Sequence, residues 1–186
     1  WDKYGIGFTL TNKMQHLCHN FDIHFGGSLE YGSIIPESSK ERYLVSSLME
    51  EAISSSQMEG AVTTRKVAKE MLRKGTVPHG RSEQMIYNNY ECIKFIKEHK
   101  DVPFSKELLL KIHSIMTFKT LENPSDEGCF REHNNIVVEN AITHETVHTP
   151  PNYEDIPEFI DSLTSFINND SNTTFIHPII RAIIIH

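Results

Sequence analysis

Residues 40–60 read KERYLVSSLMEEAISSSQMEG, and their apolar side chains recur at steps of three and four residues. This spacing is typical of an α-helix that packs one face on a core. Glycine readily takes the backbone conformation that ends a helix, so we expect this helix to run to about Met58 and to end at Gly60. Its expected inward positions are Leu44, Val45, Leu48, Met49, Ala52 and Ile53.

Segments on both sides extend the helical pattern. We expect helices over 63–74, 82–97, 105–116 and 156–168, and a last helix that begins near Thr174. Residues 1–39 are rich in glycine and predict loops, with one short helix near 14–18. The expected inward positions of the helices over 63–74 and 82–97 are Val67, Ala68, Met71 and Leu72, and Met85, Ile86, Tyr90, Ile93 and Ile96.

A different pattern interrupts the helices between residues 119 and 151. Residues 135–140 read NIVVEN, and a second short run with β-branched side chains covers Thr146–His148. Such residues favour strands, so the two runs predict a small hairpin over about 135–148. The sequence therefore predicts a mainly α fold with one β-hairpin, in which residues 1–39 form an N-terminal segment of unclear role and residues 40–186 a helical domain.

Composition excludes several classes of function. The chain has 186 residues, with 18 Lys and Arg against 25 Asp and Glu, so its net charge is −7 and we expect no nucleic-acid partner. The apolar runs are far shorter than the roughly 20 residues that cross a bilayer, so we expect no membrane span. The three cysteines form no Cys-x-x-Cys pair, which favours a reduced, cytoplasmic protein.

Residues 144–148 read HETVH and match the His-Glu-x-x-His signature of zinc proteases. One alternative is therefore a zinc metalloprotease with His144 and His148 as ligands. The signature works on a helix, where the two histidines lie one turn apart. Here it lies in the β-like segment and runs into Pro150 and Pro151, which disfavour helix in the residues before them. We therefore expect no metal site.

The helix over 40–60 ends on a run of serines followed by Gln57, Met58, Glu59 and Gly60. A carboxylate near a helix C-terminus opposes the helix dipole, which costs about 0.3–1 kcal/mol unless a cation lies nearby. Glu59 therefore predicts an arginine or lysine partner elsewhere. The plainer interpretation is a solvated glutamate beside a helix-ending glycine.

Residues 55–60, SSQMEG, resemble the inhibitory-helix motif Ser/Thr-x-x-x-Glu-Gly/Asn of the Fic family, whose members transfer AMP from ATP to protein hydroxyls. The resemblance continues in chain order and covers roughly residues 41–186. Residues 128–131, GCFR, resemble the lead into the family's flap. Residues 135–148 resemble its flap hairpin, residues 150–151 its proline exit, and residues 175–186 the helix before its active site.

The resemblance implies a Fic-type helical bundle whose substrates are ATP, with Mg²⁺, and a Tyr, Ser or Thr hydroxyl of another protein. In the family, the chemistry lies in a segment that reads His-Pro-Phe-x-Asp/Glu-Gly-Asn-Gly-Arg-x-x-Arg. Its histidine takes the hydroxyl proton, its acidic residue holds Mg²⁺, and its glycines and helix start receive the phosphates. Residues 1–186 contain no such motif. We therefore expect no catalytic residue within them, and expect the motif beyond His186.

The resemblance assigns to residues 1–186 the inhibition of AMP transfer. Glu59 would pair with the second arginine of the motif and occupy the space of the ATP γ-phosphate, so that nucleotide binds in an unproductive orientation. Ser55 would hold the same turn, and Gly60 would end the helix. The expectation is an enzyme that is inhibited by its own helix.

The hairpin gives a second expected site. By the same resemblance, Ile136, Val137 and Val138 form an edge that takes a target segment as an added strand. The plainer alternative is that Ile136 and Val138 pack on the helices beneath. A further alternative, from another class, is a non-catalytic interaction or regulatory module whose apolar residues 179–185 are covered by another chain, as in a homo-oligomer. A phosphocholine-type donor and removal of AMP stay open.

Overall fold

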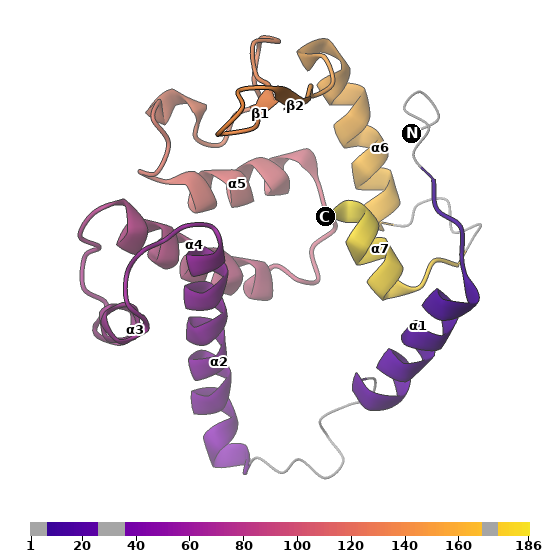
Figure 1. Ribbon diagram of the computed structural model, residues 1–186. Coiled ribbons are helices and arrows are strands. Elements are labelled where there is room, and N and C mark those ends of the chain that lie inside the picture. The colour runs from indigo at the N-terminus through magenta and orange to yellow at the C-terminus, as the bar shows by residue number, and fades with distance from the viewer. Residues whose placement is uncertain (1–6, 26–35, 169–174) are drawn as a thin grey trace. The chain divides into compact units, whose positions relative to one another are not determined.

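The computed structural model describes residues 7–25, 36–168 and 175–186 (Figure 1). The chain falls into two compact units. One covers residues 37–156, and the other combines residues 1–36 with residues 157–186. The expected domain 40–186 therefore spans nearly all of the first unit and part of the second. The expected fold class is confirmed, because the described residues are mainly helical with one two-stranded antiparallel sheet.

Four helices form the first unit: α2 (Glu37–Met58), α3 (Arg65–Lys74), α4 (Arg81–Glu98) and α5 (Lys106–Thr117). Their ends follow local chemistry. The hydroxyls of Thr64 and Ser105 accept hydrogen bonds from N–H groups in the first turns of α3 and α5. Gly75 ends α3 in the left-handed conformation that glycine tolerates best. The four predicted helices over 40–60, 63–74, 82–97 and 105–116 are thus confirmed.

The core of this unit lies where the C-terminal half of α2 meets α3 and α4. Helix α4 contacts both α2 and α5 and lies between them (Figure 1). Burial of apolar side chains is the main favourable contribution to the free energy of folding. The cluster consists of Met49, Ile53, Ala61, Ala68, Met71, Leu72 and Ile86, with Tyr87 and Tyr90 packed against it.

Four expected inward positions are wrong. Leu44 and Val45 are exposed because they lie in the first half of α2, which extends beyond the core cluster. Val67 and Ile96 are each 46% exposed. Val67 lies in the first turn of α3 and Ile96 in the last turn of α4, so the apolar pattern continues into helix ends that are exposed.

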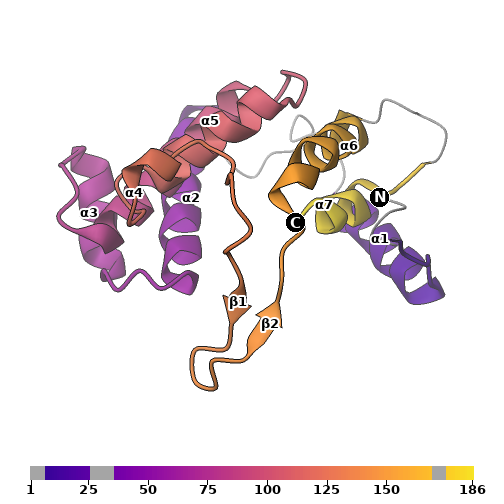
Figure 2. The ribbon, with the colours of Figure 1, turned by 90° about the horizontal axis from the view of Figure 1, so that it is seen from above.

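The predicted hairpin is present but shorter than expected. Strand β1 (Val138–Glu139) pairs antiparallel with β2 (Thr146–His148), with Val138 opposite His148 and Glu139 opposite Thr146. Residues 135–137 and Asn140, expected as strand, lie outside β1. Two short 3₁₀ helices, η2 (Pro124–Asp126) and η3 (Tyr153–Asp155), flank this region. Figure 2 shows the hairpin extending away from α4 and α5 as a narrow arm.

The second unit contains α1 (Asn12–Phe25), most of α6 (Ile156–Asn168) and α7 (Pro178–Ile185). Helix α1 is longer than the short helix expected near 14–18. Helix α6 is confirmed, whereas α7 begins at Pro178 and not near Thr174, which lies outside the described residues. The physical reason is the cap: Nδ1 of His177 accepts the N–H of Ile179, and proline suits the first helical position.

Helices α1 and α7 are joined by a hydrogen bond between Nε2 of His177 and Asp22 (3.1 Å). Because Nδ1 of the same ring accepts the Ile179 N–H, Nε2 carries the proton that Asp22 accepts. Of the apolar run 179–185, Ile180 is buried, whereas Ile183 is exposed. Among the described residues, no helix combines the length and the apolar character needed to cross a membrane.

We expect Gly128→Ala to destabilise the protein more than Gly75→Ala. Both glycines have positive φ (+71° and +61°), so either alanine costs about 1 kcal/mol of backbone strain. At Gly75 a Cβ meets open space, whereas at Gly128 it would lie 3.0 Å from Ser114 Cβ and 3.3 Å from the Leu110 carbonyl oxygen. Overpacking adds about 1–3 kcal/mol at Gly128 alone. Urea unfolding of both variants measures the difference, and equal losses would show that this loop does not press on α5.

Candidate functional site around Glu59

Helix α2 ends in a closed turn that supplies N–H donors to two of its last carbonyls. The N–H of Ala61 donates to the Ser56 carbonyl (2.9 Å), and the N–H of Gly60 donates to the Gln57 carbonyl (3.2 Å). These two bonds are the Schellman pattern. Gly60 has φ +96°, a value that side-chain-bearing residues rarely adopt. Gly60 therefore has a structural reason that is independent of any resemblance.

The segment that follows Gly60 is held on several sides. The side-chain amide of Gln57 donates to the Thr63 carbonyl (2.8 Å), and the N–H of Val62 donates to the Ser82 hydroxyl at the start of α4 (3.1 Å). Ala61 is buried in the core cluster. The backbone on both sides of Glu59 is thus fixed to the rest of the unit.

Glu59 itself is exposed. Its N–H donates to the Ser55 carbonyl (3.1 Å), so the main chain of the residue is part of the closed turn. In the part of the chain that the structure describes, no lysine or arginine forms an ion pair with its carboxylate. The cation that a helix-end carboxylate favours is therefore not among these residues. The site combines a fixed backbone with a carboxylate that faces solvent.

A buried polar contact between α2 and α4, which the sequence analysis did not identify, lies beneath this turn. The side-chain amide of Asn89 donates to the Ser56 hydroxyl (3.3 Å) and to the Ala52 carbonyl (3.4 Å). The Ser56 hydroxyl donates to the Met85 carbonyl (3.4 Å). The hydroxyl that contacts α4 thus belongs to Ser56, and the expected role of Ser55 stays a prediction. The available signal was an asparagine on the apolar stripe of α4, between Ile86 and Ile93.

Ion pairs fix α2 to α3 on another side. The carboxylate of Glu50 in α2 accepts hydrogen bonds from Lys69 and from Arg65 (2.6 Å from Nε) in α3. The hydrogen bond from Lys69, and then that from Arg65, lowers the pKa of the Glu50 carboxyl below its ordinary value of 4.5. The middle of α2 is therefore held by charge, and its C-terminal end by the Asn89 contact.

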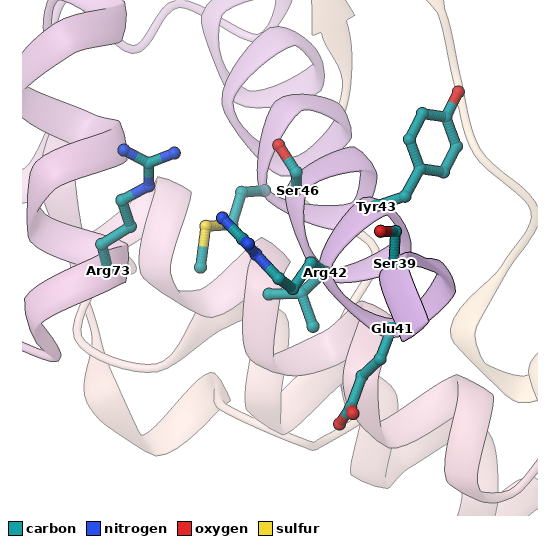
Figure 3. A pocket seen from close by; sticks show the side chains of 8 residues that line it. Ser39, Glu41, Arg42, Tyr43, Ser46 and Arg73 are labelled. Carbon is teal, nitrogen blue, oxygen red and sulfur yellow. The ribbon is translucent and has the colours of Figure 1, made fainter. Parts of the chain in front are cut away.

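A hollow of about 750 Å³ lies beside the first half of α2 (Figure 3). Arg42 and Ser46 of α2 and Arg73 of α3 line it, and Figure 3 shows Glu41 pointing away from the two arginines. Residues 42 and 59 are about 25 Å apart along a regular helix, at 1.5 Å per residue. The hollow is therefore separate from the Glu59 site.

The hairpin site is exposed, and its base is closed by Arg131. Ile136, Val137 and Val138 are 47%, 40% and 51% exposed, so the alternative in which Ile136 and Val138 pack into the helices is not met in the described residues. The Arg131 guanidinium donates to the carbonyls of His133 and Pro151, which lie on the two sides of the base. This base contact holds the two arms of the hairpin together.

The tip of the hairpin is a tight loop. The Asn140 side chain accepts the N–H groups of Ile142 (2.8 Å) and Thr143 (3.2 Å), and His144 has φ +56°. Residues 144–148 therefore run from a turn into β2, and the His-Glu-x-x-His pattern lacks the helix that its chemistry requires. Among the described residues, no three His, Cys, Asp or Glu side chains are grouped so that they could hold a metal ion.

Comparisons of the chain with models of known protein families, with curated proteins and with solved structures found no match. The interpretation of Glu59 and of the hairpin therefore depends on the motif resemblance and on the geometry described above.

We expect the stability of the protein to fall on acidification, in part through Glu50. Its pKa is lower in the folded state than the unperturbed 4.5, so its contribution is present above that value and is lost as the pH falls below it. Glu50→Gln should therefore reduce stability near pH 7 and make it less sensitive to acid. Chemical denaturation at pH 7 and at about pH 3 tests this. Glu51→Gln is the control, because Glu51 is exposed and forms no ion pair in the described residues. An equal response of the two variants would contradict the role of the Glu50 ion pairs.

Proposed function

We propose that residues 1–186 are the N-terminal and regulatory part of a Fic-type protein adenylyltransferase, which transfers AMP from ATP to a hydroxyl of another protein. The observation that supports this most is the turn at Glu59. A solvent-facing carboxylate follows the last residue of α2 on a backbone that is hydrogen-bonded before and after it. The motif resemblance places the inhibitory glutamate at this same residue.

Inhibition by Glu59 rests on simple electrostatics. An arginine and a carboxylate form two parallel charge-assisted hydrogen bonds, which are among the strong polar interactions of proteins. An arginine held in this way by Glu59 does not bind the γ-phosphate of ATP. Transfer of a nucleotidyl group needs the attacking and leaving oxygens in line, so a displaced γ-phosphate leaves the nucleotide unreactive.

The fixed backbone of Glu59 makes such a block effective. A carboxylate on a mobile loop loses conformational entropy when it forms an ion pair, which offsets much of the gain. At Glu59 the main chain is already ordered by the closed turn, and only the side-chain torsions remain to be fixed. The absence of an internal cation partner in the described residues also leaves the carboxylate available for one supplied by another segment.

Residues 1–186 lack the motif to which the resemblance assigns the chemistry on ATP. Among the described residues, no three His, Cys, Asp or Glu side chains are grouped so that they could hold a metal ion. By resemblance, the acidic residue that holds the ion and the histidine that takes the hydroxyl proton belong to the motif that residues 1–186 lack. The proposal assigns this segment to control of the reaction and to binding of the target.

The hairpin is the proposed contact for the target protein. Ile136 and Val137 precede β1 and pair with no strand in the described residues, and both side chains are exposed. An extended target segment could add to this edge through main-chain hydrogen bonds, which suits the modification of tyrosine, serine or threonine in varied sequences. The Arg131 base contact keeps the edge in position.

A second candidate function is a non-catalytic interaction module. Phe175 and Ile183, near the C-terminal end of the described chain, are 84% and 70% exposed, so both side chains are accessible to a partner. A second copy of the chain or another protein would cover them. This candidate predicts obligate association and no nucleotide binding.

We expect Glu59→Gly in the full-length protein to increase self-labelling from ATP by about tenfold or more, because loss of a charge-assisted pair of about 1.5–3 kcal/mol frees the arginine for the γ-phosphate. Transfer of radiolabel from α-labelled ATP measures the change. Glu51→Gln, on the exposed side of the same helix, is the control and should leave labelling unchanged.

Unchanged or lower labelling in Glu59→Gly would contradict the proposal. The intact mass and C-terminal peptides of the protein isolated from its own cells, measured first, show whether the His-Pro-Phe-x-Asp/Glu-Gly-Asn-Gly-Arg motif is present. A protein without the motif that forms oligomers and binds no nucleotide would favour the interaction module.

A further inference from the structure

The buried contact of Asn89 with α2 joins two successive turns of that helix. Ala52 and Ser56 are four residues apart and lie one above the other on the face that meets α4. The Asn89 amide donates to the Ala52 carbonyl and to the Ser56 hydroxyl. Asn89 is 9% exposed and Ser56 4% exposed, so water does not replace these bonds readily.

The N–H donors of the Asn89 amide and the O–H donor of Ser56 all have acceptors nearby. A side-chain amide has two N–H donors, and both have an acceptor on α2; the Ser56 hydroxyl donates in turn to the Met85 carbonyl. The distances of 3.3–3.4 Å are at the long end of the usual range, so each bond alone is weak. The constraint comes from the cost of leaving buried polar groups without partners, about 1–3 kcal/mol each.

Ser56 connects this network to the turn that carries Glu59. Its side chain contacts α4, and its carbonyl accepts the N–H of Ala61 in the Schellman turn. Glu59 directly follows the last residue of α2, so a rotation of the last turn about the helix axis also redirects Glu59. Asn89 thus contacts, through Ser56, the turn on which Glu59 lies.

Apolar packing alone does not fix the rotation of the last turn of α2. Met49, Ile53 and Ile86 hold α2 against neighbouring helices, but apolar contact is not directional and tolerates small rotations and shifts. Hydrogen bonds between buried groups select one arrangement. The two kinds of contact therefore differ in whether they specify a direction.

We propose that Asn89 is a positioning residue for the inhibitory carboxylate: through Ser56 it fixes the rotation of the last turn of α2, so that Glu59 points to one place. The inference rests on the proposed function, in which Glu59 blocks the γ-phosphate position. The neighbouring Asn88 is buried too, but its amide donates to the carbonyls of Met116 (3.1 Å) and Phe118 (2.7 Å) at the end of α5. Asn88 therefore serves as the matched control.

The test is self-labelling of the full-length protein from α-labelled ATP, with thermal unfolding of each variant alongside. We expect Asn89→Leu, which keeps the branched shape of the side chain and removes the hydrogen bonds, to raise labelling several-fold toward the level of Glu59→Gly. Ser56→Ala, which removes the shared hydroxyl by a smaller change, should act in the same direction. Asn88→Leu should lower the unfolding temperature without raising labelling.

The double variant Asn89→Leu/Glu59→Gly separates positioning from general loosening. If Asn89 acts only through Glu59, the double variant labels no faster than Glu59→Gly, because the two effects are not additive. A second readout does not depend on catalysis. Amide hydrogen exchange of Gly60 and Ala61 in the full-length protein should quicken in Asn89→Leu, while that of Val67 at the start of α3 should not.

Three outcomes would overturn the inference. The first is release of labelling by Glu59→Gly with none in Asn89→Leu and Ser56→Ala, which leaves the proposed function intact. The second is an equal rise in Asn88→Leu and Asn89→Leu, which would indicate general loosening. The third is unchanged exchange at Gly60 and Ala61 in Asn89→Leu. Failure of Glu59→Gly to raise labelling would instead contradict the proposed function itself.

Discussion

The end of α2 depends on one constraint: its last carbonyls must find donors while its apolar face stays buried. Gly60 satisfies the first requirement by taking a positive φ, which brings the N–H groups of Gly60 and Ala61 back to the helix. The same reversal puts Ala61 into the core beside Ile53 and leads the chain into α3. The position of Glu59, between the two, is a consequence of how this helix stops.

The helices could be predicted because their signals are local. Periodic apolar residues showed α2 to α6, and Thr64, Gly75 and Ser105 marked ends by their own hydrogen-bonding or backbone preferences. Burial was less predictable, because it depends on which neighbour a turn meets. Val67 continues the apolar pattern of α3 but is exposed, and nothing in its local sequence indicates this.

The candidate site shows the same division between local and distant information. Glu59 and Gly60 could be identified because a helix end and its motif are contiguous in sequence. The contact of Asn89 with Ser56 joins residues 33 positions apart, and that of Arg131 with Pro151 joins residues 20 positions apart. An asparagine on an apolar stripe indicates that a buried hydrogen-bond partner exists, but the sequence does not show which residue it is. Long-range pairing of this kind requires the folded structure.

The base contact of Arg131 has a consequence for how the hairpin can evolve. Its guanidinium binds the carbonyls of His133 and Pro151, which are main-chain atoms present whatever the side chains between them. Substitutions along the exposed arm therefore leave the closure of the loop untouched, and they remove nothing from the core cluster of α2, α3 and α4. Mutation and selection can change the arm's surface while the helices that support it keep their stability.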